Sequence, residues 1–532
     1  MKRTLLLYFI INYLLFAQQD TIITITPEIE LPDFVITGMA KIEMPTHTKS
    51  IPDAFTPLSP EFILPKIGIE SLKLEGLSDP EKQYPSIIDT STKYTTRASL
   101  GSGFYSLPIL DLFYANSLNK LKFSLTSEFE NQRKYEDYSN YTKLKFGFTN
   151  TYLFEKKGNP PARFALKGTF DRFYFSNFKS EKPDEFKSIN NFHINGVFEN
   201  LFWREFNVTV GGTVGYQKIT QWDYDFLKIS PFLTTQSTYE HFELKLTAEP
   251  SLYRTAKNYI ENKLVLAARG EMYFRRVFNK LSFIARMDYQ SEKEDKNQFL
   301  APSFILGIGL SDFWNMSIFY TNNIVNFAPI DLWGLNPYLD SNSYKISFER
   351  IKKRIGFGTI IYFDRLSNLQ LEFSRYDILG KNVFISANKI GFFESRNLET
   401  ERVELKMSLL VNFRKFGESF IQMMYLNSKL KQYVKKEPHA PEFQLKFSYK
   451  CKFNFPLSLK ISFSYNSTSY GDTLNLMKID SYKLLALSGE YQFNKMISSG
   501  ILLNNLLNKK NYLWYNYTEK PIDFTIYLLV KF

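Results

Sequence analysis

The chain has 532 residues and a formal net charge of +12, and 23% of its residues are charged. A mean hydropathy of −0.25 excludes a bundle of membrane-spanning helices. The basic residues form no block typical of nucleic-acid binding, so we expect no nucleic-acid partner. The single cysteine, Cys451, excludes an internal disulfide and a thiolate metal site. Aromatic residues are frequent, with 51 Phe, 34 Tyr and 5 Trp, and they favour strands and membrane interfaces.

The N-terminus has the pattern of a secretory signal peptide. Lys2 and Arg3 precede an apolar run from Leu5 to Phe16, and the small residue Ala17 follows it. The run contains about a dozen apolar residues, fewer than the roughly 20 that cross a bilayer as a helix. We therefore expect a signal peptide at residues 1–17 that is cleaved during export.

Residues 18–92 are rich in proline, with nine prolines between Pro27 and Pro85. Such spacing interrupts both helices and strands. We predict an extended periplasmic segment for these residues.

From Lys93 onward, apolar and polar residues alternate through repeated segments. In residues 443–455 every second residue is apolar, and lysine, serine, glutamine and asparagine fill the other positions; residues 402–414 repeat this with one slip at Leu410. These segments are about 10 to 14 residues long, the length that a tilted strand needs to cross a bilayer. Because main-chain groups in lipid must be paired, such strands in an exported chain predict a closed barrel.

We therefore predict an all-β protein, a transmembrane antiparallel β-barrel of about 22 strands over residues 93–532. Short turns are expected at one end and longer polar loops at the other. The short ones are residues 117–120, 156–160 and 455–456, and the long ones are 131–140, 177–188, 290–298, 326–343 and 431–441. The last strand alternates Phe524, Ile526, Leu528, Val530 and Phe532 with other residues, the pattern that outer-membrane assembly machinery recognises.

The C-terminal region resembles the closing hairpin of TonB-dependent receptors. It has an asparagine-rich run at residues 504–512, an aromatic loop with Trp514 and Tyr515, and a last strand ending in Phe532. Residues 336–339 and 354–358 are similar to the family's mid-barrel loop and the strand after it. Near the N-terminus, the run Thr21, Ile22, Ile23, Thr24 and Ile25 resembles the TonB box, and residues 31–38 resemble a variant of it.

One departure from that family concerns its globular plug domain. Residues 39–92 are too few and too rich in proline to form such a plug. The layout resembles a plugless branch of TonB-receptor-like barrels from Bacteroidetes-type bacteria. The resemblance implies a place in the outer membrane of a Gram-negative cell, contact with its lipid and with the barrel assembly machinery, and transport of a solute. It also implies a TonB-like protein or another periplasmic partner, and no cofactor.

The sequence offers little catalytic chemistry. The four histidines are far apart and lack metal-ligand spacing, and no Gly-x-Ser-x-Gly motif is present. An outer-membrane hydrolase with His193 or His241 as its base is the enzyme alternative, but we expect no catalytic or metal site. An interfacial girdle accounts for Trp203, Trp222, Trp314, Trp333 and Trp514, with sugar stacking as a second interpretation of Trp333.

A barrel of about 22 strands would leave a wide aqueous hole. We therefore expect it to be occluded by residues 18–92, by long loops that fold inward, or by a partner protein. Lysines that face the interior, such as Lys143 and Lys145, either favour anions or balance glutamates such as Glu128; the second interpretation is favoured. A structural barrel that anchors an envelope complex is the alternative to transport.

Overall fold

The computed structural model describes residues 96–154, 162–203, 206–256, 261–277, 281–292, 298–340, 343, 346–387 and 389–532. The signal peptide and the proline-rich segment predicted for residues 1–92 lie outside these ranges. No helix among the described residues is long and apolar enough to cross a membrane.

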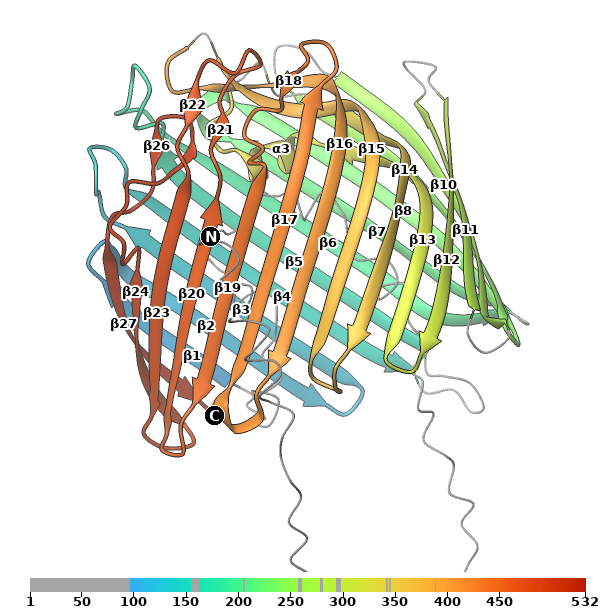
Figure 1. Cartoon of the computed structure of the whole chain (residues 1–532), viewed down its shortest axis with the longest axis horizontal. Helices are drawn as coiled ribbons and strands as arrows, with labels where there is room; N and C mark the ends of the chain where they lie inside the picture. The colour runs from blue at the N-terminus through green and yellow to red at the C-terminus, as the bar shows by residue number, and fades with distance from the viewer. Residues whose placement is uncertain are drawn as a thin grey trace, which may run out of the picture. The chain divides into compact units, whose positions relative to one another are not determined.

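Twenty-two antiparallel strands form a closed barrel (Figure 1). The sheet has 23 strands, but β18 (Lys435–Lys436) only extends the edge of β17, which leaves 22 in the ring. Each strand of the ring pairs with the next one along the chain, and β1 (Thr96–Gly103) closes it by pairing with β27 (Asp523–Lys531). The predicted fold class and strand number are confirmed.

The other strands of the ring are long and follow one another with few interruptions. They are β2 (Ser106–Leu118), β3 (Leu121–Gln132), β4 (Tyr141–Phe154), β5 (Ala162–Ser176), β6 (Phe186–Trp203), β7 (Phe206–Ile219), β8 (Tyr224–Tyr239), β9 (Phe242–Ala256), β10 (Glu261–Val277), β11 (Leu281–Glu292), β12 (Gln298–Ser311), β13 (Trp314–Phe327), β14 (Ser347–Tyr362), β15 (Asn368–Ser386), β16 (Phe393–Asn412), β17 (Glu418–Leu430), β19 (Phe443–Lys452), β20 (Leu457–Asn466), β23 (Tyr482–Gln492) and β24 (Ile497–Asn504).

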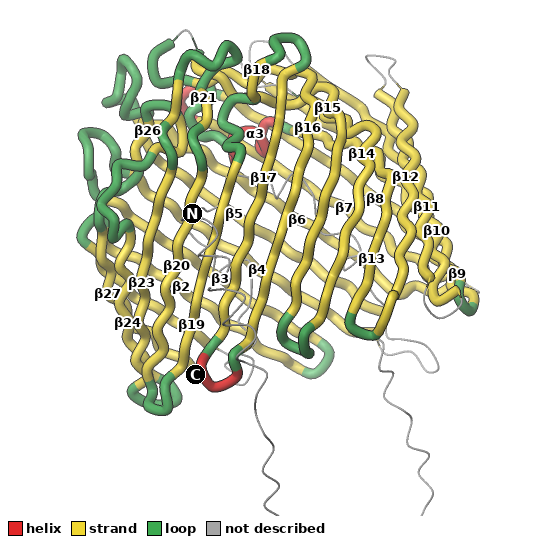
Figure 2. The backbone as a smooth tube through the Cα atoms, viewed as in Figure 1, coloured by secondary structure: helices red, strands yellow, loops and turns green. Residues whose placement is uncertain are grey.

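The two ends of the barrel differ in their connections (Figure 2). At the turn end, which also holds the C-terminus, the connections are short, as at residues 119–120, 240–241 and 453–456. At the loop end the longer connections are residues 133–140, 177–185, 328–346, 431–442, 467–481 and 505–522. The predicted asymmetry is therefore confirmed for the described residues; the turn at 156–160 and most of the loop at 290–298 lie outside them.

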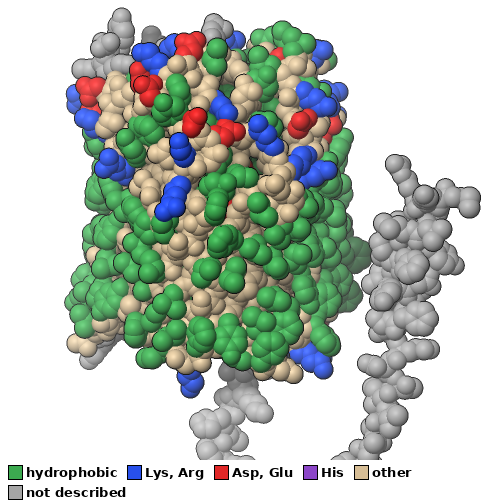
Figure 3. Space-filling model, turned by 90° about the vertical axis from the view of Figure 1, so that its left-hand side faces the viewer, with side chains coloured by type: hydrophobic (Ala, Val, Ile, Leu, Met, Phe, Trp, Pro, Cys, Tyr) green, Lys and Arg blue, Asp and Glu red, His purple; other side chains and the backbone are tan. Residues whose placement is uncertain are grey.

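Each strand turns one face outward and the other inward, because successive side chains point to opposite sides. On β16, Leu405 is 45% exposed on the outside, whereas Arg402 on the inner face is 1% exposed. Hydrophobic side chains cover most of the outer face in Figure 3, and charged ones gather towards one end. This segregation is the one expected of a wall between lipid and a polar interior.

Smaller elements lie at the loop end. They are α3 (Pro329–Leu335), the 3-10 turn η4 (Thr220–Trp222), the hairpin of β21 (Ser469–Tyr470) and β22 (Lys478–Ile479), and the hairpin of β25 (Tyr512–Trp514) and β26 (Tyr517–Thr518). The turn η6 (Arg414–Phe416) lies at the opposite end.

Candidate functional site: the barrel interior and its loop end

Part of the inner wall is open to water. Lys145 on β4 lies 3.8 Å from Glu128 on β3, and their side chains are 49% and 41% exposed although both face the interior. Lys143, two residues earlier, lies over the rings of Tyr141 and Phe173. The pairing of Lys145 with Glu128 agrees with the charge-balance interpretation of these lysines.

The inner wall formed by β14 to β17 is different, because its charges are buried in ion pairs. The pairs are Arg354–Glu372 at 2.7 Å, Lys381–Glu349 at 3.0 Å and Arg402–Glu437 at 2.6 Å. These polar side chains face the interior, as the alternation predicts, but they are not open to water. Buried charges must be paired and hydrogen-bonded, so this wall is held in a fixed arrangement.

Loops from opposite sides of the barrel meet at the loop end. Gly391, between β15 and β16, lies so close to the loop between β5 and β6 that a Cβ atom on it would come within 2.6 Å of the main chain at Lys179 and Ser180. β5 and β15 are ten strands apart in one direction and twelve in the other, since the ring has 22 strands. The contact therefore spans the diameter of the mouth.

A third loop, at residues 505–522, joins this contact. The Tyr517 hydroxyl donates to the Gly391 carbonyl oxygen at 2.6 Å, and the Tyr517 ring stacks on Tyr338 with centroids 3.7 Å apart. On the other side, the Tyr135 hydroxyl donates to the Thr518 carbonyl oxygen at 2.6 Å. Burial raises the pKa of both Tyr135 and Tyr517, so both hydroxyls remain protonated donors.

A buried apolar cluster, which we call the cap, lies beneath these loops. Trp333 of α3 is 2% exposed and packs against Trp222 at 5.0 Å between centroids. The Lys187 ammonium is enclosed by rings of Phe175, Trp222, Trp333 and Phe392 at 4.9–5.5 Å, a cation–π arrangement. Other members are Ile189, Ile219, Phe226, Tyr253, Val265, Phe327, Ala328, Leu332, Leu339, Ile346, Phe393, Trp514 and Tyr517. Inward-folding loops, one of the three predicted means of occlusion, are thus present.

Substituting Trp333 with alanine should loosen the cap. Removal of a fully buried tryptophan leaves a cavity and costs about 3–5 kcal/mol, so amide hydrogens of residues 328–340 should exchange faster. The matched control is Trp314→Ala, because Trp314 is 39% exposed on the outer surface. Unchanged exchange in the Trp333 variant would show that the cap does not hold these loops.

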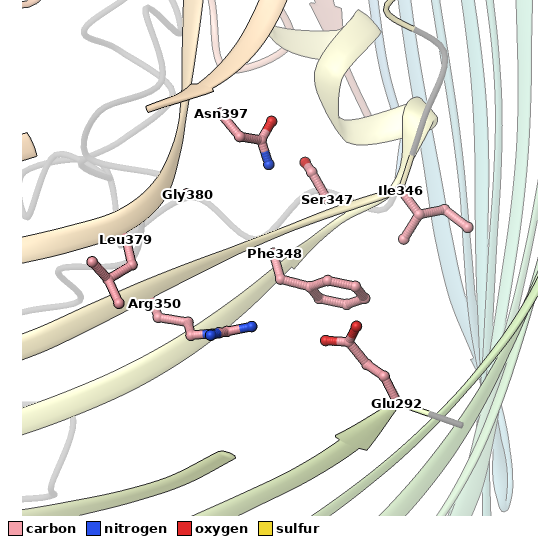
Figure 4. A pocket seen from close by; sticks show the side chains of 8 residues that line it. All are labelled: Glu292, Ile346, Ser347, Phe348, Arg350, Leu379, Gly380 and Asn397. Carbon is pink, nitrogen blue, oxygen red and sulfur yellow. The ribbon is translucent and has the colours of Figure 1, made fainter. Parts of the chain in front are cut away.

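A pocket of about 290 Å³ lies beside the cap (Figure 4). It is lined by Glu292 of β11, residues of β14 and β15, and Asn397 of β16. The full set is Glu292, Ile346, Ser347, Phe348, Arg350, Leu379, Gly380 and Asn397. One carboxylate, one guanidinium and apolar walls could hold a small polar group attached to an apolar one.

The residues of the predicted assembly signal line the outside of the closing strand. Phe524, Ile526, Leu528 and Phe532 are 44–60% exposed, and Val530 is half-buried. The TonB-box-like residues Thr21, Ile22, Ile23, Thr24 and Ile25 lie outside the described part of the chain.

The histidines are not brought together. His193 lies within β6, and His241 lies exposed in a turn. His439 lies in the loop at residues 431–442, where both its ring nitrogens are buried and its ring packs on Trp514 at 4.8 Å. Burial lowers the pKa of His439 to about 3, so this ring is neutral at physiological pH. Within the described ranges, no cluster of His, Cys, Asp or Glu could hold a metal ion.

The prediction of an interfacial tryptophan girdle is only partly correct. Trp314 is exposed on the outside and its Nε1 donates to Thr359 at 2.8 Å, as an interfacial residue would. Trp222, Trp333 and Trp514 instead belong to the cap or pack against it. Their burial among aromatic neighbours, not a membrane interface, explains these three positions.

The arrangement of strands is similar to that of several solved receptor and transporter structures. The siderophore receptor PiuA from Acinetobacter baumannii superposes with a TM-score of 0.65 at 12% identity, covering 83% of this chain and 82% of that one. The chain has the barrel fold of these receptors. The FrpB iron transporter from Neisseria meningitidis gives a TM-score of 0.64 at 11% identity, covering 83% and 81%. The copper transporter OprC gives 0.61 at 12% identity, covering 82% of each chain.

No model of a known family and no curated protein matches the sequence. The receptor fold is therefore established by the arrangement of strands, and the TonB-dependent-receptor resemblance of the barrel is confirmed at that level. The structural neighbours are transport receptors, not enzymes.

Proposed function

We propose that the chain is an outer-membrane barrel that transports a hydrophilic solute, is exported with a signal peptide cleaved near Ala17, and has no globular plug. The water-accessible inner wall at Lys145 and Glu128, inside a closed ring whose loop end is spanned by its own loops, carries this proposal. The names of the structural neighbours, which include siderophore, iron and copper receptors or transporters, support the same class of activity.

In this proposal the loops at the loop end act as a gate. The loop end faces outward and the turn end faces the periplasm, since barrels of this kind have short periplasmic turns and longer external loops. The contact at Gly391 is built from main chain and tyrosine hydrogen bonds, and the ion pairs Lys179–Glu136 and Lys389–Asp340 join the same loops to their neighbours, so the mouth would open when these loops separate. The solute would then pass along the polar wall of β3 and β4.

Residues 18–92 form a periplasmic segment in this proposal, and Thr21–Ile25 contacts a TonB-like protein by adding a strand to it. An added strand donates main-chain N–H groups, and proline has none. The barrel also contacts outer-membrane lipid along its apolar outer face, and the assembly machinery through Phe524, Ile526, Leu528, Val530 and Phe532.

Ile23→Pro should therefore abolish energised uptake in cells while the purified barrel keeps its conductance and its folded mobility on gels. Ile23→Val, which preserves strand pairing, is the control and should behave as the wild type. Uptake that survives Ile23→Pro would remove the TonB-like contact from the proposal. A stable periplasmic complex on residues 18–92 with no uptake defect would instead favour a scaffold.

A further inference from the structure

The ladder between β12 and β13 stops halfway along the two strands. Each strand is 14 residues long, but their pairing runs only from Ser311–Trp314 to Phe304–Tyr320. On the outer sides, β12 stays paired with β11 up to Gln298, and β13 with β14 up to Phe327. Residues 298–303 and 321–327 are therefore two strand edges that face a split in the wall, which we call the seam.

Local sequence explains where the seam begins. Asn322 Nδ2 donates to the Pro302 carbonyl oxygen at 2.7 Å, so the main-chain edge of Pro302 that carries this carbonyl faces β13. Because proline has no N–H, Pro302 cannot donate a ladder hydrogen bond to β13 from that edge. Ser303 Oγ then takes the place of main-chain partners, because it lies 3.0 Å from the nitrogen and 2.9 Å from the oxygen of Asn322. Side-chain hydrogen bonds of Ser303 and Asn322 thus end the ladder.

Proline alone does not split the wall. Pro231 on β8 and Pro250 on β9 interrupt the pairing of their strands between Ile229–Leu252 and Leu233–Ala248, but the ladder continues on both sides. At the seam it does not resume among the described residues of β12 and β13.

At the seam, β14 lies across the inner face of β10 to β12. The Arg350 guanidinium stacks 3.0 Å from the centre of the Phe299 ring on β12, and the Lys263 ammonium of β10 lies 6.0 Å from the Phe348 ring. Phe299 is an inner-face residue, since its neighbour Leu300 is 64% exposed on the outside. The upper part of β14 therefore overlaps β10–β12 from within, and the pocket of Figure 4 lies in this overlap.

The seam begins beside apolar outer surface. Leu300 in the edge at residues 298–303, its β11 partner Tyr289 (37% exposed) and Leu266 on β10 (49%) carry hydrophobic side chains along this part of the wall. Unpaired main-chain groups cannot face hydrocarbon. They can face the polar head of a lipid, and the pocket next to them offers both charged and apolar lining.

We propose that the seam is a lateral binding site for a single-chain phospholipid from the bilayer. Its phosphate would bind Arg350, whose fork of N–H donors suits phosphate oxygens. The apolar chain would lie along residues 298–303 beside Leu300. This goes beyond the proposed transport of a hydrophilic solute and does not depend on it.

Photo-crosslinking tests the proposal with the whole chain in a nanodisc. A lysophosphatidylethanolamine with a photoreactive chain should label residues 298–303 and 321–327 preferentially, and Arg350→Ala should reduce this labelling about tenfold, the loss expected for one charge-assisted hydrogen bond. Lys352→Ala is the matched control, because Lys352 is exposed, lies two residues away on β14 and is not part of the pocket lining. Labelling spread evenly over the outer strands, or unaffected by Arg350→Ala, would overturn it.

Hydrogen exchange gives a test that needs no substitution. Residues 298–303 and 321–327 form no ladder with each other, so the amides that point into the seam should exchange at least several-fold faster than those of residues 304–309 and 315–320, which pair across β12 and β13. Equal protection would show that the seam is closed and would overturn the proposal. Neither readout involves transport, so a failure here is separate from a failure of the proposed function.

Discussion

Gly391→Ala should convert the barrel into a conducting pore. Gly391 has a φ of +77°, which L-residues rarely adopt, and its Cβ would lie 2.6 Å from the Lys179 and Ser180 main chain. Main chain cannot move aside as a flexible side chain can, so the loops from β5–β6 and β15–β16 must separate. Single-channel recordings in planar bilayers should show a conductance several-fold above that of the wild type, because a ring of about 22 strands encloses a wide channel.

Gly334→Ala is the matched control for this variant. Gly334 lies in α3 within the same loop region, but a Cβ there would meet nothing within 4 Å, so conductance should stay at the wild-type level. Deletion of residues 20–90 should likewise leave the conductance low if the loops close the mouth. A Gly391 variant with wild-type conductance, combined with a large increase on deletion, would transfer the occluding role to the N-terminal segment.

Arg402→Met should be strongly destabilising. Arg402 is 1% exposed, and its guanidinium donates to both carboxylate oxygens of Glu437 at 2.6 Å and to Ser428 Oγ at 3.2 Å. Methionine leaves Glu437, which is 5% exposed, without this partner. Loss of one member of a buried pair costs about 3–5 kcal/mol, which unfolding in detergent monitored by gel mobility would register.

The double variant Arg402→Met with Glu437→Met separates the cost of leaving a buried carboxylate without its partner from the net contribution of the ion pair. It removes both charges, so most of the stability should return, since apolar replacements of a buried pair are often neutral. Arg375→Met is the control: its pair with Glu401 joins the adjacent strands β15 and β16 but is 69% and 41% exposed, so the loss should stay within about 1 kcal/mol. A single variant as stable as the wild type would show that the Arg402–Glu437 pair does not hold β16 to the loop at residues 431–442.

The sequence predicted the wall of the barrel well, because that wall depends on local alternation. Lipid outside and polar groups inside impose a two-residue period on every strand, and Leu405 and Arg402 follow it. The pairing of β1 with β27 follows from an even strand number. The sequence alone allows residues 345–363 and 370–393 to be divided in more than one way, and the structure forms one long strand in each, β14 (Ser347–Tyr362) and β15 (Asn368–Ser386).

The loop end could not be predicted in the same way. Tryptophan suits both an interfacial girdle and a buried cluster, so Trp333 and Trp514 gave no sign of which one they join. The contact between Gly391 and Lys179 joins loops that are remote in sequence, and no local pattern encodes it. Glycine at a strand boundary was the available signal, since it permits a positive φ. The seam has a similar origin: Pro302 is visible in the sequence, but Pro231 and Pro250 look the same and only interrupt their ladder, which continues on both sides.

Cysteine accessibility along β4 tests most directly whether each strand separates lipid from a water-filled interior. In a Cys451→Ser background, single cysteines would be placed at 143 and 145 on the inner face and at 144 and 146 on the outer face. In bilayers, a small water-soluble thiol reagent should modify the first two and spare the second two. Equal reaction at all four positions, or the reverse pattern, would contradict the barrel as a wall between lipid and water.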